Sequence, residues 1–217
     1  MKHSNLFVMI LVMFLFFAVN TSYSQVTDKD GNSYKTVTIG KQDWMAENLN
    51  VEHYRNGDPI PEVQDKEEWD NLTTGAWCWY ENNSANGTTY GRLYNWYAVN
   101  DPRGLAPEGW LIPSSDEWNK LTDNLGGAET AGTKLKSTSG WSEGGNGDNK
   151  SGFTAIPGGY RTHDGYFSNM GKNALFWTST EFNSANAWFR NVIGSIPDVY
   201  APNYGKDFGL SVRCVKD

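Results

Sequence analysis

Hydrophobic and polar residues alternate at a period of two in several segments, a spacing typical of β-strands. Near the start of the chain, "YKTVTI" predicts a strand, followed by a turn at Gly40-Lys41 and a second short strand or ribbon around residues 44–49. Towards the end, the same alternation predicts strands at residues 174–182, 187–193 and 208–215. The second half is therefore expected to be rich in antiparallel strands.

A helical period replaces this alternation in and just after "APEGWLIPSSDEWNKL", residues 106–121. Trp118, Leu121 and Leu125 recur at i, i+3 and i+7, which is the spacing of the buried stripe of a helix. Gly126-Gly127 follows, and glycine commonly ends a helix. We predict a helix here, with Trp118 in the core.

The adjacent acids of this stretch could form a catalytic carboxylate pair or the start of the helix. Ser114 and Glu117 have the S-x-x-E spacing of a capping box, in which the hydroxyl accepts from the backbone N–H of residue 117 and the carboxylate reaches back. Asp116 lies in the first turn, where the helix dipole favours a negative charge. We interpret Asp116 and Glu117 as helix-start residues.

The remaining segments have weaker patterns. Residues 62–72 predict a short helix, residues 83–87 a turn, and residues 89–100 irregular or helical structure. A long region rich in Gly and Asn covers residues 138–171. Short helices combined with antiparallel strands and this long loop region predict an α+β domain.

The N-terminus has the pattern of an export signal. Lys2 precedes a 14-residue apolar run at residues 6–19, and the small residues Ser22 and Ser24 follow it. This order predicts a secretory signal peptide over residues 1–24. The run is shorter than the ~20 residues of a membrane-spanning helix, and an uncleaved anchor is the alternative. We expect an exported domain over residues 25–217, secreted or at the cell surface or in the periplasm, with no membrane span after cleavage.

The charge of the chain limits its partners. The formal net charge is −7, and removal of residues 1–24, which contain Lys2 and no acid, makes it −8. No block of Lys and Arg is present. Nucleic acid requires a basic surface, so nucleic acid is not an expected partner, and anionic membrane surfaces are disfavoured for the same reason.

Aromatic residues are unusually frequent, with 10 Trp, 11 Tyr and 10 Phe beside 23 Gly. Large rings supply much buried area per residue, so they can stabilise a domain that is rich in loops. The same rings also stack on sugars. The count does not separate core from binding platform, and we expect most of these rings to be core.

Two cysteines, Cys78 and Cys214, lie far apart in the sequence. An exported protein can form a disulfide between them, and two buried thiols are the alternative. In "FGLSVRC" the alternation places Phe208, Leu210 and Val212 on the same strand face as Cys214.

Residues typical of catalysis are scarce. His53 and His163 are isolated, and the sequence contains neither H-x-x-x-H nor C-x-x-C. We therefore predict a non-catalytic protein without a cofactor. The one metal that the sequence suggests is calcium, because "GGNGDN" (residues 144–149) resembles a calcium repeat and carboxylate and amide oxygens suit this ion. The oxygens would come from Asp148, Asn149, Asp164 and Glu181. A glycine-rich turn without metal is the alternative.

The candidate binding surface lies in the second half. Period two places Trp188 and Arg190 on one face of a strand, opposite Phe189 and Asn191. Alternatively, Trp188 is core and Arg190 forms an ion pair with Glu181. The segment "DVYAPNYGK", residues 198–206, places aromatic and amide side chains in a Pro/Gly loop, a composition that suits a glycan or a surface protein. The predicted ligand-contacting residues are Tyr160, Arg161, Glu181, Trp188, Arg190, Tyr200, Asn203 and Tyr204.

Several motifs in the right order resemble the Fibrobacter succinogenes major paralogous domain, from about residue 37 to the C-terminus. They are "GRLYNWYAVND" (91–101), "LAPEGWLIPSSDEWNKL" (105–121), "GFTAIPGGYR" (152–161), "FWTSTEFNSANAWFRN" (176–191) and "GLSVRCVKD" (209–217). Members of this family occur on exported bacterial proteins and have no established biochemical activity.

The resemblance extends more distantly to the C-type-lectin-like fold of formylglycine-generating enzymes and of variable receptor-binding proteins of phage. The enzymes bind copper through a close cysteine pair, whereas Cys214 stands alone here and Ala106 replaces a cysteine frequent in the family. Cys78 is thus the remaining candidate partner for Cys214, in place of the usual disulfide of the family. In the phage proteins the C-terminal part of the fold contacts ligand. These resemblances imply a secreted, non-catalytic recognition or surface module, with a structural envelope component or an oxidase of formylglycine type as alternatives.

Overall fold

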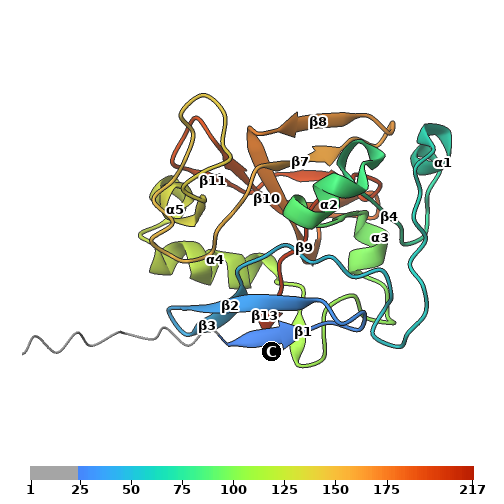
Figure 1. Ribbon diagram of the computed structural model, residues 1–217, viewed down its shortest axis with the longest axis horizontal. Coiled ribbons are helices and arrows are strands. Elements are labelled where there is room, and N and C mark those ends of the chain that lie inside the picture. The colour runs from blue at the N-terminus through green and yellow to red at the C-terminus, as the bar shows by residue number, and fades with distance from the viewer. Residues whose placement is uncertain (1–23) are drawn as a thin grey trace, which may run out of the picture.

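Two β-sheets lie at opposite ends of the protein, with short helices and long loops between and beside them (Figure 1). The computed structural model describes residues 24–217, so the predicted signal peptide lies outside the described residues except for Ser24. In Figure 1 the first sheet is at the bottom, the second sheet is at the top, and helices α4 and α5 lie at the left.

The first sheet is antiparallel and contains both the first and the last strand of the described chain. In spatial order its strands are β1 (Gln25–Thr27), β2 (Ser33–Ile39), β3 (Gln42–Met45), β13 (Val215–Lys216) and β6 (Trp110–Leu111). The β2–β3 turn contains Gly40 at φ 64°, a left-handed conformation that glycine adopts without strain. The predicted strand and turn are therefore confirmed, whereas the second strand, predicted around residues 44–49, covers Gln42–Met45.

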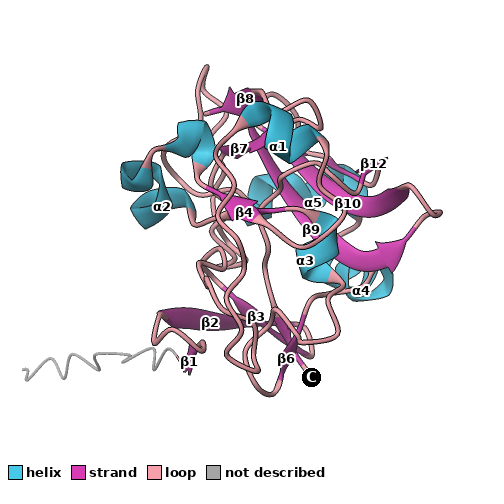
Figure 2. Cartoon of the chain, turned by 90° about the vertical axis from the view of Figure 1, so that its right-hand side faces the viewer, coloured by secondary structure: helices cyan, strands magenta, loops and turns pink. Residues whose placement is uncertain are grey.

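The second sheet is built around the long β9–β10 hairpin, which is prominent in Figure 2. In spatial order its strands are β11 (Val199–Tyr200), β10 (Asn186–Ile193), β9 (Asn173–Glu181), β7 (Gly158–Arg161) and β8 (Phe167–Met170), and β12 (Asn203–Gly205) also pairs with β10. The β7–β9 pair is parallel, and the other pairs are antiparallel. The strands predicted at residues 174–182 and 187–193 are confirmed within one residue.

The helices are short. They are α1 (Lys66–Asp70), the 3₁₀ helix η1 (Tyr80–Asn82), α2 (Ser84–Tyr90), α3 (Trp96–Val99), α4 (Ser115–Asn124) and α5 (Ala128–Leu135), and the ribbon β4 (Trp77–Cys78)–β5 (Leu93–Tyr94) lies among them. α4 begins at the predicted capping box: the backbone N–H of Glu117 donates to the Ser114 hydroxyl, and the Ser114 N–H donates to the Glu117 carboxylate at 2.8 Å. Asp116 and Glu117 are helix-start residues, as predicted.

One local prediction is wrong. Residues 83–87 were predicted to form a turn, but they begin helix α2. The Asn83 side chain accepts from the backbone N–H of Ala85, so this asparagine is an N-cap. Helix α5 was not predicted, because Gly127 precedes it and Gly132 interrupts its apolar pattern.

An aromatic cluster joins the first sheet to α4 and the second sheet. The Trp44 and Trp118 rings are 5.1 Å apart, and Phe153 and Phe176 lie within 5.8 Å of their neighbours in the cluster. Edge-to-face pairs of this kind contribute ~0.5–1.5 kcal/mol each beyond area burial. Trp118 is fully buried, which confirms its predicted place in the core.

The strand predicted at residues 208–215 is replaced by an extended segment with changing partners. Leu210 pairs with Tyr94, Ser211 with Phe176, and Val215 with the first sheet. The segment crosses from one sheet to the other, so no continuous ladder forms. The predicted face is nevertheless confirmed, because Leu210, Val212 and Cys214 are buried in one hydrophobic cluster and Phe208 packs against it.

Short helices and mostly antiparallel sheets make this an α+β protein, as predicted. Among residues 24–217, no helix has the length and apolar character needed to cross a membrane.

Candidate ligand-binding surface

The two faces of the second sheet have different environments. Phe176, Val192 and Val199 pack with α4 and α5 in a buried cluster on one face. On the opposite face, Asn191 stands directly beside Leu175 on β9 and Tyr200 on β11. Tyr200 is 48% exposed, so this second face is open to solvent at its β11 edge.

Aromatic rings from three further positions pack against the buried middle of this face, where Leu175, Trp177 and Phe189 belong to the other hydrophobic cluster. Tyr204 of β12 lies 4.5 Å from the buried ring of Phe189 and 4.5 Å from Phe208, on which it stacks. Tyr160 of β7 lies 6.2 Å from Tyr204 and 6.3 Å from Phe208. All three of these outer rings are half-buried. Burial raises the pKa of the Tyr204 phenol, so its hydroxyl remains protonated at neutral pH.

Two asparagines on this face hydrogen-bond to each other and retain unused amide groups. Asn173 Nδ2 donates to Asn191 Oδ1 at 3.0 Å. Among the described residues, neither the Asn191 amide nitrogen nor the Asn173 amide oxygen has another side-chain hydrogen bond. If the nitrogen and oxygen positions of both amides are exchanged, the hydrogen bond reverses its direction, and one amide nitrogen and one amide oxygen still remain free. We call the set Tyr160, Tyr200, Tyr204, Asn173 and Asn191 the tyrosine face.

A shallow groove of about 350 Å³ runs along this face at β11. It is lined mainly by apolar groups, with one amide: Asn191, Ile193, Ile196, Tyr200, Ala201 and Pro202. An apolar wall with a small number of polar groups is the usual composition of a small-molecule site. The groove can hold a ring against Tyr200 within reach of the free amides.

Three of the predicted ligand-contacting residues, Tyr160, Tyr200 and Tyr204, therefore lie on one face of the sheet, with Tyr160 and Tyr204 as neighbours. Two others, Trp188 and Asn203, stand opposite each other in β10 and β12. A bulge between Ala187 and Phe189 interrupts the alternation at Trp188, whose ring packs edge-on against the exposed Phe182 at 5.0 Å. The exposed Phe182 and the half-buried Trp188 thus form a separate pair at the β9–β10 turn.

Arg161 and Arg190 are not surface residues, so their predicted contact with ligand is wrong. Arg161 is 0% exposed and donates to four backbone carbonyls, including that of Val63 at 2.6 Å. Arg190 is 4% exposed and donates to Asn119 Oδ1 and the Ser115 carbonyl on α4. Both guanidinium groups hydrogen-bond to other segments inside the protein. Burial lowers the pKa of Arg190.

The alternative ion pair between Arg190 and Glu181 is also wrong. Glu181 is exposed and accepts from Lys206 Nζ at 2.7 Å. Lys206 is almost buried, lies over the Trp96 ring and also donates to the Ser184 carbonyl. Glu181 stands opposite Ala187, which stands opposite Tyr204, so its carboxylate lies at the β9–β10 end of the same sheet face, paired with Lys206 and away from Tyr200.

Three contributors to the open face were not predicted as site residues: Asn173, Asn191 and Phe208. The period-two pattern already placed Asn191 beside Phe189, opposite Arg190. Choosing between the two faces required knowing which one α4 and α5 cover, and this depends on tertiary packing.

The four residues predicted for calcium have separate local partners. Asp148 pairs with Lys150 at 2.8 Å, Asn149 bonds to Thr154, and Asp164 accepts from the Thr162 hydroxyl at 2.5 Å. Within residues 24–217, one group of three carboxylate or imidazole side chains has its ligand atoms within 4.8 Å of one another: Asp30, Glu52 and His53. There His53 Nδ1 lies 2.6 Å from Asp30, and Arg92 donates to Glu52 at 3.0 Å.

The predicted disulfide is not formed, and both cysteines are free buried thiols. Cys78 packs with Trp69, Tyr80 and Leu93, whereas Cys214 belongs to a different hydrophobic cluster. The two side chains pack in different parts of the core and are therefore not in contact. Burial raises the pKa of Cys78 to about 12 and raises that of Cys214 as well.

A second hollow of about 420 Å³ lies between the β2–β3 hairpin and α2. Its solvent-accessible groups include Glu47, Asn50 and the hydroxyls of Thr88 and Thr89. Arg213 lies beneath it, fully buried and bonded to carbonyl and amide oxygens. This hollow offers hydrogen bonds but no exposed aromatic ring among its lining residues, unlike the tyrosine face.

Comparison with known proteins identifies the family. Residues 37–216 match the model of the Fibrobacter succinogenes major domain, so the chain belongs to that family. No curated protein and no solved structure was found to match.

Proposed function

We propose that this member of the Fibrobacter succinogenes major domain family is an exported, non-catalytic recognition module that binds a glycan or a surface protein through the tyrosine face. The observation that carries this proposal is that Tyr160, Tyr200 and Tyr204, from three strands, lie on one face of the sheet. Tyr160 neighbours Tyr204, and Tyr200 stands beside two asparagines with free amide groups. Exposed or half-buried tyrosines next to polar groups are typical of recognition surfaces.

The proposed mechanism is non-covalent. The Tyr200 ring supplies a flat apolar surface on the wall of the groove, and the Asn173–Asn191 pair supplies one donor group and one acceptor at the same level of the sheet. Because their mutual hydrogen bond already holds the Asn173 and Asn191 side chains, these two lose little conformational entropy on binding. A ligand with both an apolar face and hydroxyl or amide groups suits this arrangement.

The fold is proposed to be C-type-lectin-like. In support, the N-terminal strands and the last strand share one sheet, and the second sheet carries the proposed binding surface in the C-terminal half. Export through residues 1–24 is part of the same proposal and rests on the sequence of that segment.

Two rival functions make different predictions. An oxidase of formylglycine type would need reactive thiolates, whereas Cys78 and Cys214 lie buried in separate clusters. A structural envelope component would self-associate, and light scattering at rising protein concentration detects this.

A glycan array and a pull-down from bacterial or host surface material test the proposal. We expect saturable binding in at least one of them above an unrelated exported control protein. Absence of binding in both would contradict the proposal, and concentration-dependent growth in particle size would favour the structural alternative.

A further inference from the structure

We infer that the tyrosine face takes an uncharged glycan chain, longer than one sugar ring, that lies along the face from Tyr200 to Tyr204. This inference rests on the proposed function, since it names the ligand of the same surface. Three features of the face carry it: the spacing of its tyrosines, the position of its free amides and the absence of charge among its residues.

The strand register gives the spacing. Tyr200 stands opposite Asn191, and Tyr204 stands opposite Ala187, four positions away along β10. At about 3.3 Å per residue, the two positions are roughly 13 Å apart along the strand. A single pyranose ring that stacks on Tyr200 therefore does not reach Tyr204 and Tyr160, whereas a chain of several rings does.

The amides divide the face into two unequal parts. Asn173 and Asn191 lie beside Tyr200, so the β11 end combines a ring with a free donor and a free acceptor. The other end combines Tyr204, Tyr160 and Phe208 and is mainly aromatic. Hydroxyl groups of one sugar can bond at the first part while a later sugar in the same chain stacks at the second.

Charge argues against an ionic ligand. None of the residues of the tyrosine face or of its groove is charged. Of the charged groups beside these strands, Lys172 pairs with Glu143 at 3.0 Å and Lys206 pairs with Glu181. Asp198, just before β11, and Asp207, just before Phe208, have no ion pair among the described residues, and their negative charge repels an anionic ligand. The chain has a formal net charge of −7, which repels polyanionic glycans at long range. A neutral glycan is not repelled by this charge.

The test is isothermal titration of the purified protein with neutral oligosaccharides of one linkage, from the monosaccharide to the hexasaccharide. The linkage is chosen from those retained on the glycan array. We expect affinity to rise by about tenfold or more with chain length and then to level off once the chain spans both parts. Added salt should leave this affinity nearly unchanged, because screening weakens charge interactions.

Two variants locate the effect. Tyr200→Ala should reduce the affinity for long chains to that of short ones, and Phe182→Ala, which removes an equally exposed ring from the β9–β10 turn (48% each), should not. Thermal unfolding of both variants checks that they are folded.

The outcomes separate the inference from the proposed function. Equal affinity for the monosaccharide and the longer chains would overturn the inference alone. So would salt-sensitive binding of an anionic glycan, or binding of a surface protein without any glycan. Binding to neither glycans nor surface proteins would overturn both.

Discussion

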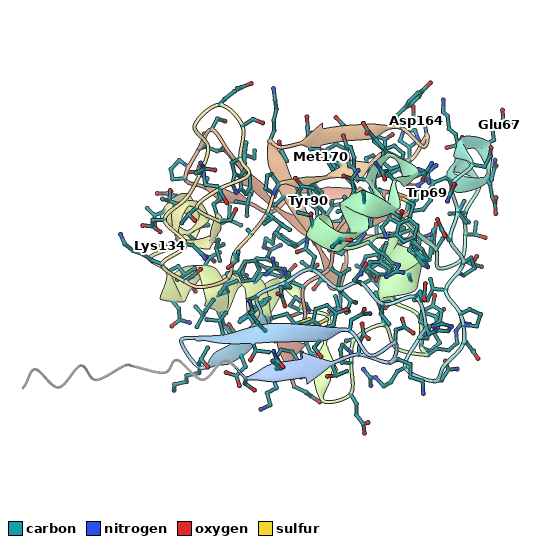
Figure 3. All side chains as sticks on the ribbon, viewed as in Figure 1. Glu67, Trp69, Tyr90, Lys134, Asp164 and Met170 are labelled. Carbon is teal, nitrogen blue, oxygen red and sulfur yellow. The ribbon has the colours of Figure 1, made fainter. Side chains whose placement is uncertain are left out.

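The Arg161 guanidinium lies 4.3 Å from the centre of the Trp69 ring, and both side chains are fully buried. In Figure 3, α1 lies at the right-hand edge of the protein, and the Trp69 label stands on the inner side of this helix. This contact joins β7 to the 63–65 segment, where Arg161 donates to the carbonyls of Val63, Gln64 and Asp65. Arg161 was predicted to contact ligand, but its contacts instead hold β7 against residues 63–65.

Replacing Arg161 should therefore affect stability. Arg161→Ala leaves several buried carbonyls without donors, and we expect a loss of ~3–5 kcal/mol in the free energy of unfolding, measured with urea. The matched control is Arg103→Ala. Arg103 is more than a third exposed and pairs with Asp101 at 2.8 Å, and an exposed pair contributes ~0–1 kcal/mol. Equal effects of the two variants would contradict this role for Arg161.

The cysteines should be unreactive in the folded protein. Burial and raised pKa values keep both thiols protonated and covered. We expect no alkylation by iodoacetamide under native conditions and two additions per chain in denaturant, measured by mass spectrometry without reductant. A mass lower by two hydrogens, with no alkylation after unfolding, would reveal a disulfide and refute the free thiols.

The capping box of α4 should make a measurable contribution to stability. Ser114→Ala removes the side-chain acceptor for the Glu117 N–H, and we expect a loss of about 1 kcal/mol in unfolding free energy. Ser115→Ala is the control at the next position. Within residues 24–217 the buried Ser115 hydroxyl has no hydrogen-bond partner, so its removal should be neutral or stabilising.

Asp207 should lower stability at neutral pH. Burial raises the pKa of its carboxyl, and Oδ1 has no hydrogen-bond partner within the described residues. The folded state therefore holds the proton more tightly than the unfolded state, so this residue's stabilising contribution is present at acid pH and is lost as pH rises through the folded pKa. We expect Asp207→Asn to be more stable than wild type at neutral pH and to lose that advantage in acid.

Asp164 provides a control of opposite sign. The Thr162 hydroxyl lowers the pKa of Asp164, so ionised Asp164 is favoured in the folded state at neutral pH, and this contribution is lost in acid. Asp164→Asn should therefore give no gain at neutral pH. A gain of the same size in both variants would show that the effect is not specific to the buried carboxyl of Asp207.

Local patterns in the sequence predicted local structure well. The capping box at Ser114 and the alternation in β9 and β10 depend on neighbouring residues, and the structure confirms both. The α+β class follows from the same patterns.

Predictions that depended on distant contacts were less accurate. The burial of Arg161 and Arg190 depends on carbonyls supplied by the 63–65 segment and by α4. The separation of Cys78 from Cys214 depends on which cluster each side chain enters. The sequence predicted Tyr160, Tyr200 and Tyr204 as site residues. That they share a sheet face with Asn173 depends on the strand register, which could not be predicted from the sequence.

Equilibrium binding of Tyr200→Ala and Phe182→Ala to the ligand retained by the wild-type protein tests the role of the tyrosine face most directly. Both rings are 48% exposed, but Tyr200 belongs to the tyrosine face and Phe182 to the β9–β10 turn. We predict a loss of affinity of about tenfold for Tyr200→Ala, equivalent to ~1.4 kcal/mol, and no change for Phe182→Ala. Unchanged binding by Tyr200→Ala, or a loss confined to Phe182→Ala, would contradict recognition through the tyrosine face.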